Sequence, residues 1–154
     1  MTTRFDIEHV APGIYAAMGA LERYLHGCGL EPALIHLVKL RASQMNGCAY
    51  CLDMHWKDLR ALGETEQRLY SLDAWRECPY YTPRERAALA WTEAVTMVAS
   101  GHVPDAVYDA VRPQFDDAAL ANLTLAVATI NAWNRLAIAG RDEPGTYQPA
   151  TAPA

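Results

Sequence analysis

The chain has 154 residues, of which 51% are hydrophobic and 20% charged, and its formal net charge is −5. This length suits a single domain with a sizeable core, and the hydrophobic content excludes a chain that is disordered for most of its length. An acidic balance without a long basic run argues against nucleic-acid binding. The apolar content is high for one small protomer, so we expect a homo-oligomer.

The start of the chain carries acidic residues where a secretory leader would have its apolar stretch. No segment has the roughly 18 uninterrupted apolar residues that a membrane helix needs. We therefore expect a cytoplasmic protein without a membrane partner. In that reducing compartment, four cysteines are more often thiols, metal ligands or redox centres than structural disulfides.

Apolar residues recur at helical spacing along most of the chain, and strand patterns are almost absent. Gly47 and Gly140 are expected to end helices, and Thr82 with Glu85 has the pattern of a capping box. We predict an all-α, single-domain helical bundle over residues 1–140, followed by a flexible C-terminal arm, 141–154, that contains three prolines. The seven expected helices cover about residues 12–27, 32–46, 48–62, 64–75, 82–100, 104–111 and 116–139.

The segment around Cys48, Cys51 and His55 is the most informative part of the sequence. In a helix these residues share one face, and Cα atoms three residues apart lie at roughly 5 Å, which allows a disulfide to close. Because the helix is expected to begin at Cys48, its positive end favours thiolates. His55, one turn beyond Cys51, is placed to accept a proton or to stabilise a thiolate. These are the groups of a site that reduces peroxides through a dithiol/disulfide cycle.

Other interpretations of the cysteine pair are weaker, although two of them remain open. Haem attachment needs a histidine directly after the second cysteine, and Leu52 stands there. A thioredoxin-like fold needs a strand before the motif, and none is predicted. Zinc held by both cysteines and His55, with His36 or Cys78 as the fourth ligand, remains an alternative. So does a pair of cysteines that only fills space in the core.

The residues from Leu37 to His55, with their CxxCxxxH pattern, closely resemble the core of the AhpD-like alkylhydroperoxidases, which belong to the carboxymuconolactone decarboxylase superfamily. The likeness covers roughly residues 12–140. It implies an all-helical protein that assembles as a homotrimer or homohexamer. It also implies a peroxidase in which Cys51 forms the sulfenic acid and Cys48 resolves it and passes protons. An external dithiol or protein then supplies the electrons, and no bound cofactor or metal is expected.

In one position the chain departs from the family. AhpD has a glutamate twelve residues before the first cysteine, where this chain has His36. A neutral imidazole also accepts protons, so we expect His36 in the relay with an altered pH dependence. Glu93 lies in a helix that is otherwise nearly free of charge, and the likeness extends through Trp91 to Glu93. We therefore expect Glu93 near the cysteines, in place of the missing glutamate.

The remaining polar residues and cysteines are expected to be structural. Cys28 and Cys78 have no partner at helical spacing and are predicted to be small buried residues. Tyr50 is expected to pack over the cysteine motif or to gate access to it. Polar residues of the last helix are expected to anchor a core or subunit interface, and three histidines are expected at the surface. These two sets are Asn131, Asn134 and Arg135, and His9, His26 and His102.

We therefore predict a thiol-dependent peroxidase acting on organic hydroperoxides or hydrogen peroxide, with Cys51, Cys48, His55, His36 and Glu93 in the site. The alternatives are a cofactor-free decarboxylase or lyase of the wider superfamily and a metal-holding structural oligomer. The last helix and the apolar run after Glu85 are expected at subunit contacts.

Overall fold

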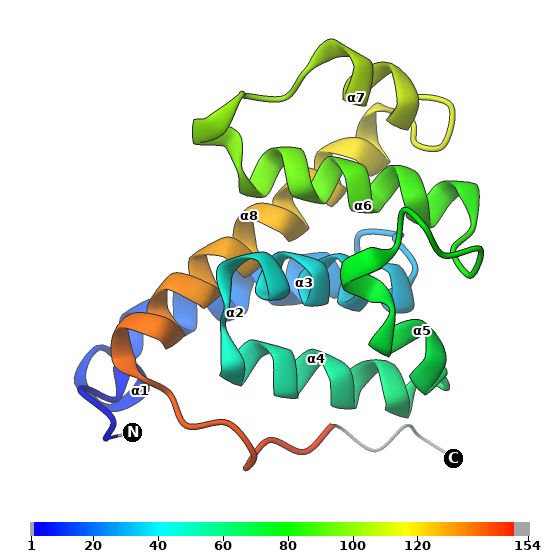
Figure 1. The fold of residues 1–154 in the computed structure, drawn as a ribbon. Coiled ribbons are helices and arrows are strands. Elements are labelled where there is room, and N and C mark those ends of the chain that lie inside the picture. The colour runs from blue at the N-terminus through cyan, green and yellow to red at the C-terminus, as the bar shows by residue number, and fades with distance from the viewer. Residues whose placement is uncertain (1, 150–154) are drawn as a thin grey trace.

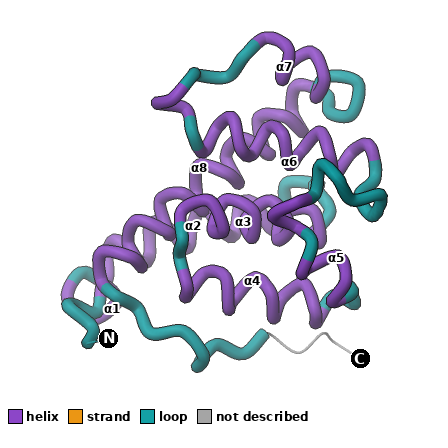
Figure 2. The backbone as a smooth tube through the Cα atoms, in the orientation of Figure 1, coloured by secondary structure: helices purple, strands orange, loops and turns teal. Residues whose placement is uncertain are grey.

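The computed structural model describes residues 2–149, which form eight α-helices and two short 3-10 helices without a β-strand (Figure 1, Figure 2). The predicted all-α single-domain fold is confirmed. No helix in this part of the chain combines the length and hydropathy needed to cross a membrane. In chain order the α-helices are α1 (Ile7–Val10), α2 (Pro12–His26), α3 (Pro32–Asn46), α4 (Ala49–Ala61), α5 (Glu66–Tyr70), α6 (Pro83–Thr96), α7 (Asp105–Val111) and α8 (Asp117–Gly140).

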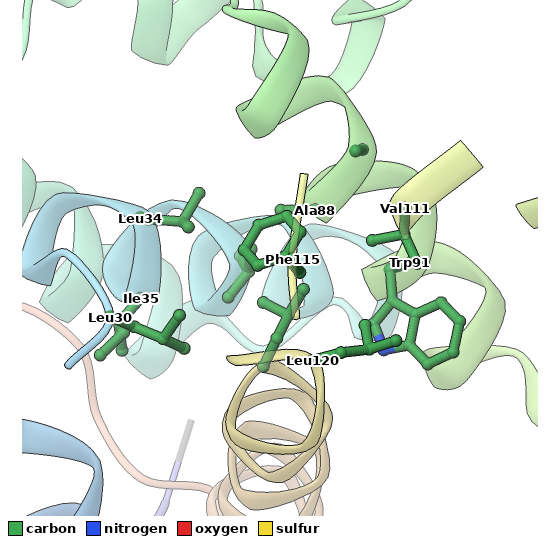
Figure 3. Close-up of a cluster of buried hydrophobic side chains, with 11 residues drawn as sticks. Leu30, Leu34, Ile35, Ala88, Trp91, Val111, Phe115 and Leu120 are labelled. Atoms are coloured by element: carbon green, nitrogen blue, oxygen red, sulfur yellow. The ribbon is translucent and has the colours of Figure 1, made fainter. Parts of the chain in front are cut away.

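Helix α3 lies at the centre of the molecule and packs against α4, α6 and α8 (Figure 1). Its apolar residues are buried on nearly every side, which is typical of a helix in the middle of a core. Figure 3 shows one core cluster, in which Ile35 of α3, Ala88 of α6 and Leu120 of α8 gather around Phe115. Phe115 is only 2% exposed. This packing fixes the position of α3 in the core and, with it, the side chains that α3 directs towards α4.

A single glycine makes the turn between α3 and α4. Gly47 adopts the left-handed conformation (φ 68°) that a side chain disfavours, and it ends α3 as predicted. Cys48 follows at once as the N-cap of α4. The cysteine motif is therefore held in the first turn of α4, directly beside the end of the central helix.

Two other local predictions have different outcomes. The capping box at the start of α6 is present, because the Thr82 hydroxyl accepts from the Glu85 N–H (3.2 Å) and the Glu85 carboxylate accepts from the Thr82 N–H (2.7 Å). The single helix expected over 64–75 is wrong in part. The chain forms the short helix α5 and then a 3-10 turn, Leu72–Ala74. The tighter turn helps to bring Leu69, Leu72 and Trp75 into one buried cluster.

The end of α8 also differs from its prediction. Gly140 does not stop the helix but is its last residue, and Arg141 takes the left-handed conformation (φ 59°) instead. Gly140 is buried, because the N-terminal segment passes over it: the Arg4 N–H donates to the Gly140 carbonyl (2.8 Å). A Cβ at position 140 would lie 3.2 Å from the Phe5 carbonyl oxygen. A glycine therefore lets the N-terminal segment pass close to the end of α8 without displacement.

The described part of the predicted flexible arm, 141–149, runs back along α4 (Figure 1). Lys57 of α4 donates to the carbonyl oxygens of Gly145 (3.2 Å) and Tyr147 (2.9 Å), and Asp53 accepts from the Gly145 N–H (3.0 Å). These contacts hold the segment against the helix that carries the cysteines. Residues 150–154 of the predicted arm lie outside the described residues.

Many of the chain's apolar residues are buried within the chain itself. Helix α8 packs its apolar residues mostly against α3, α6 and α2 of the same chain, and Ile138 is its exposed large apolar side chain. The run after Glu85 exposes Met97 and Val98 at its end. Further exposed apolar side chains lie on α2, among them Ile14 and Tyr24. The oligomer stays a prediction, with these residues as candidates for its contacts.

Candidate active site

Cys48 and Cys51 are joined by a disulfide at the start of α4, with their Cα atoms 5.4 Å apart. This distance agrees with the expectation from helical spacing. The sulfur of Cys48 caps the helix and accepts from the Cys51 N–H (3.4 Å). Both residues are buried, with Cys48 1% and Cys51 4% exposed. Because Cys48 is the N-cap and Cys51 lies in the first turn, the pair lies at the positive end of a 13-residue helix, where thiolates are stabilised.

Cys51 lines a cavity of about 680 Å³, a size typical of small-molecule sites. Helices α2, α3, α4 and α8 and the C-terminal arm enclose it. Leu25, Ile35 and Ile130 are among the apolar residues of its wall. Besides Cys51, the polar lining residues include Glu22, His26, His36, Lys39, His55, Asp58 and Tyr147. Cys48 is not one of the lining residues, so Cys51 is the sulfur next to the cavity.

Two histidines and one aspartate converge at one side of this cavity. The Nδ1 atoms of His36 and His55 are 3.3 Å apart. Oδ2 of Asp58 lies 3.3 Å from Nδ1 of His36 and 3.4 Å from Nδ1 of His55. His36 comes from α3, and His55 and Asp58 come from one face of α4. The structure thus brings both predicted histidines together with Asp58, which was not among the predicted site residues.

Tyr147 completes this group from the C-terminal arm. Its hydroxyl donates to Oδ1 of Asp58 (2.6 Å), so both oxygens of this carboxylate are engaged. Burial and, after it, the Asp58 carboxylate raise the pKa of the Tyr147 hydroxyl above its usual range. Tyr147 therefore stays protonated and serves as a donor. Its position in the sequence, 89 residues after Asp58, gave no local signal of this contact.

The protonation of the group follows from burial and hydrogen bonding. Burial lowers the pKa of His55 to about 4, although the hydrogen bond with Asp58 acts in the opposite direction. Burial works to raise the pKa of Asp58, but hydrogen bonds from the two imidazoles and from Tyr147 outweigh it and hold that pKa well below its usual range. At neutral pH, His55 is therefore an uncharged imidazole beside an ionised carboxylate.

Glu93 is not brought to this cavity. Its carboxylate accepts from Nε of Arg41 (2.8 Å) and from the indole N–H of Trp75 (2.8 Å), and it pairs with Arg76 (2.5 Å). Burial works to raise the pKa of Glu93, but these hydrogen bonds and the two guanidinium groups lower it. Glu93 was expected near the cysteines, but its three partners lie in a separate polar cluster.

The other residues selected from the sequence have structural surroundings. Cys28 and Cys78 are free, partly buried and packed against core clusters. Tyr50 packs against the cluster that contains both motif cysteines. The expected polar anchors of α8 are present: Asn46 donates to Asn131 (3.0 Å) and to Asn134 (2.8 Å). Arg135 bonds Asn131 on its own helix, and the three histidines expected at the surface, His9, His26 and His102, are exposed.

The residues that can hold a metal ion also differ from the sequence-based alternative. That alternative used both cysteines and His55, but the cysteines are bonded to each other. Among the described residues, the metal-ligating side chains that gather are His36, His55 and Asp58, whose ligand atoms lie within 4.8 Å of one another.

This chain is similar in sequence and in fold to several known proteins. Residues 12–94 match the profile of the carboxymuconolactone decarboxylase family. An uncharacterized Bacillus subtilis protein, YdfG, is 43% identical over 139 residues, which cover 90% of this chain and 95% of YdfG. This chain is also 42% identical to an Agrobacterium tumefaciens protein of unknown function whose crystal structure is known. An AhpD antioxidant-defence role has been ascribed to that protein. It superimposes with a TM-score of 0.92 and covers 95% of this chain and all of its own.

A more distant structure shares the fold alone. It is a peroxidase-related protein from Ralstonia eutropha with an alkylhydroperoxidase AhpD core, and it is 22% identical. Its TM-score is 0.80, over 91% of this chain and 74% of its own. The AhpD-like architecture inferred from the CxxCxxxH segment is confirmed by these likenesses.

Proposed function

Since the chain belongs to the carboxymuconolactone decarboxylase family and has an AhpD-like fold, we propose that it is a thiol peroxidase for organic hydroperoxides or hydrogen peroxide. The observation that carries this proposal is the cysteine pair at the start of α4, with the sulfur of Cys51 next to a cavity large enough for a small organic molecule. The likeness to the Agrobacterium protein, to which an AhpD antioxidant-defence role has been ascribed, supports a peroxidase-related role in general.

The cycle begins with both cysteines reduced. The Cys51 thiolate attacks one oxygen of the peroxide, the O–O bond breaks, and an alcohol or water leaves with a proton. Cys51 is now a sulfenic acid. The Cys48 thiol attacks its sulfur, water leaves, and the disulfide forms. Two electrons have passed from the two sulfurs to the peroxide, and an external dithiol or a reducing protein returns them.

The surroundings of the pair suit each step. The N-terminus of α4 stabilises the Cys51 thiolate, and the short Cα separation of the pair allows the disulfide to close with little backbone movement. His55 lies one helical turn from Cys51, and when its Nδ1–H donates to Asp58 its other nitrogen is free to accept a proton. His36 offers a second imidazole in the same group. Glu93 is left out of this scheme, because its partners lie elsewhere.

A free-thiol titration tests the proposal. Fully reduced protein, freed of metal with a chelator, has four thiols, and one equivalent of an alkyl hydroperoxide should leave two. Cys51→Ser should retain its thiols and consume no peroxide, whereas the matched variant Cys78→Ser should behave as the wild type. An unchanged thiol count in the wild type would contradict the proposal. Peroxide consumption that survives in Cys48→Ser/Cys51→Ser would contradict it as well.

In the cell, we expect the protein in the cytoplasm as a homotrimer or homohexamer, with a dithiol or protein reductant as its partner. Light scattering coupled to gel filtration measures the assembly, and a monomer would contradict this part of the proposal.

A further inference from the structure

We propose that His36, His55 and Asp58 form a binding site for one zinc ion per chain, beside the cysteine pair and separate from it. All three ligand atoms are nitrogen or oxygen, and no sulfur takes part. The inference therefore goes beyond the thiol chemistry and does not depend on it.

The distances within the group carry the inference. The three separations between Nδ1 of His36, Nδ1 of His55 and Oδ2 of Asp58 are 3.3, 3.3 and 3.4 Å. Ligands at about 2.0–2.1 Å from a tetrahedral zinc ion are separated by about 3.3–3.4 Å, since a tetrahedron's edge is about 1.63 times its centre-to-vertex distance. An octahedral ion with the same bond lengths, such as magnesium, would need about 2.8–3.0 Å. The three atoms already form one face of a zinc-sized tetrahedron.

Hydrogen bonding alone does not account for this convergence. If both imidazoles donate from Nδ1 to Oδ2 of Asp58, their two N–H groups face each other across 3.3 Å. If one imidazole donates to the other, the second has no Nδ1 proton for the carboxylate. At most two of the three contacts can be hydrogen bonds. One cation satisfies all three atoms, which would bind it through their lone pairs.

The surroundings meet the other requirements of a metal site. Tyr147 donates to the second oxygen of Asp58 (2.6 Å), the kind of contact that orients a carboxylate ligand. The ligands line the 680 Å³ cavity, which provides an entry path and room for a fourth ligand such as water. Two imidazoles and a carboxylate suit zinc and its transition-metal neighbours, whereas calcium and magnesium prefer oxygen ligands alone.

Occupancy would change what the histidines can do. Each imidazole that binds a metal through Nδ1 keeps its proton on the other nitrogen, so it no longer accepts one there. The metal-bound and proton-accepting forms of His55 therefore exclude each other.

Zinc binding to the chelator-treated protein is the direct test, measured by competition with a chromophoric chelator. We expect one zinc ion per chain, and we expect His36→Ala and Asp58→Asn each to weaken binding by at least about ten- to hundredfold. The matched control His26→Ala removes an exposed histidine of the same cavity and should bind as the wild type. Circular dichroism confirms that each variant is folded. Equal affinity in wild type and His36→Ala, or no binding by the wild type, would overturn the inference.

A second measurement separates this site from one built on thiols. Cys48→Ser/Cys51→Ser should bind zinc with the wild-type stoichiometry and affinity. Cobalt(II) in the wild type should show the intense visible absorption of a tetrahedral ion without a thiolate charge-transfer band. Loss of binding in the double cysteine variant, or a thiolate band, would overturn the inference while leaving the peroxidase proposal standing. Conversely, a failed thiol titration leaves the zinc titration unaffected.

Discussion

Asp58 and Glu93 are two partly buried carboxylates in the same small molecule, and their surroundings differ. Their side chains are 11% and 15% exposed, and in both cases hydrogen bonds outweigh burial and lower the pKa. Glu93 contacts two guanidinium groups and an indole N–H. Asp58 contacts two imidazoles and a phenolic hydroxyl, and it lines the cavity beside Cys51.

Because of this difference in partners, we expect Glu93 to stabilise the fold and Asp58 to take part in the chemistry of the site. The charge of Glu93 is neutralised by permanently cationic partners, so the group has little affinity left for anything else and serves to hold α3, α6 and the segment around Trp75 together. The partners of Asp58 include the buried imidazole of His55, which is uncharged at neutral pH. Its negative charge is therefore available to orient a base or to bind a cation.

The largest effect should come from Asp58→Asn. Without the carboxylate charge, His55 loses the group that orients its proton, and we expect kcat/KM for an alkyl hydroperoxide to fall by at least about 100-fold. The assay uses metal-free, folded enzyme. The paired variant Glu93→Gln should consume peroxide as the wild type does. A wild-type rate in Asp58→Asn, or a comparable loss in Glu93→Gln, would remove the distinction between the two carboxylates.

Glu93→Ala should act on stability instead. It leaves Nε of Arg41 and the Trp75 indole without their acceptor, and we expect the free energy of unfolding to drop by about 2–3 kcal/mol in urea. Glu93→Gln keeps one acceptor oxygen and should lose less. Equal stability in Glu93→Ala and wild type would show that the cluster is not an anchor.

Tyr147→Phe should have a smaller effect. It removes the hydroxyl that ties the C-terminal arm to Asp58, and we expect a loss of about 1 kcal/mol in the free energy of unfolding. Tyr70→Phe is a suitable control, since its hydroxyl contacts Glu66 on the exposed surface of a short helix. If both variants lose the same amount, the arm is not held by this hydrogen bond.

The smallest expected effect is on the free energy of unfolding at acidic pH. The folded state lowers the pKa of Glu93 below its ordinary 4.5, so its ionised form stabilises the fold above that pH. This contribution is lost as the pH falls from about 4.5 through the lower folded-state value. The difference in unfolding free energy between wild type and Glu93→Gln should therefore be constant near neutral pH and shrink in acid. A difference that grows on acidification would contradict this assignment.

Local patterns predicted much of the framework. The CxxC spacing, the glycine at position 47 and the capping box of α6 each act within one helical turn, so sequence alone was sufficient to locate them. Asp58 was also within reach of such reasoning, because it follows His55 by three residues on the same helical face. It was missed because the aspartate is surrounded by other charged residues of α4, and spacing alone does not show which of them point inward.

The remaining contacts join segments that are far apart in the chain. Glu93 meets Arg41 across 52 residues, and Tyr147 meets Asp58 across 89. Such pairs depend on the angles at which α3, α4 and α6 cross and on the direction of the arm after α8. Helical periodicity predicts neither of these. The same limit applies to α8: its apolar surface predicted burial, but not that α3, α6 and α2 of the same chain would cover much of it.

The one-residue turn at Gly47 has a consequence for how this fold can vary. His36 and His55 lie on two consecutive helices, and the only residues between those helices are Gly47 and the cap, Cys48. Each residue added to the start of α4 would rotate His55 by about 100° about the helix axis. Insertions and deletions are usually tolerated in loops, but at this junction they would disengage the two imidazoles. We therefore expect natural length variation in this architecture to occur elsewhere, in the connections on either side of α7.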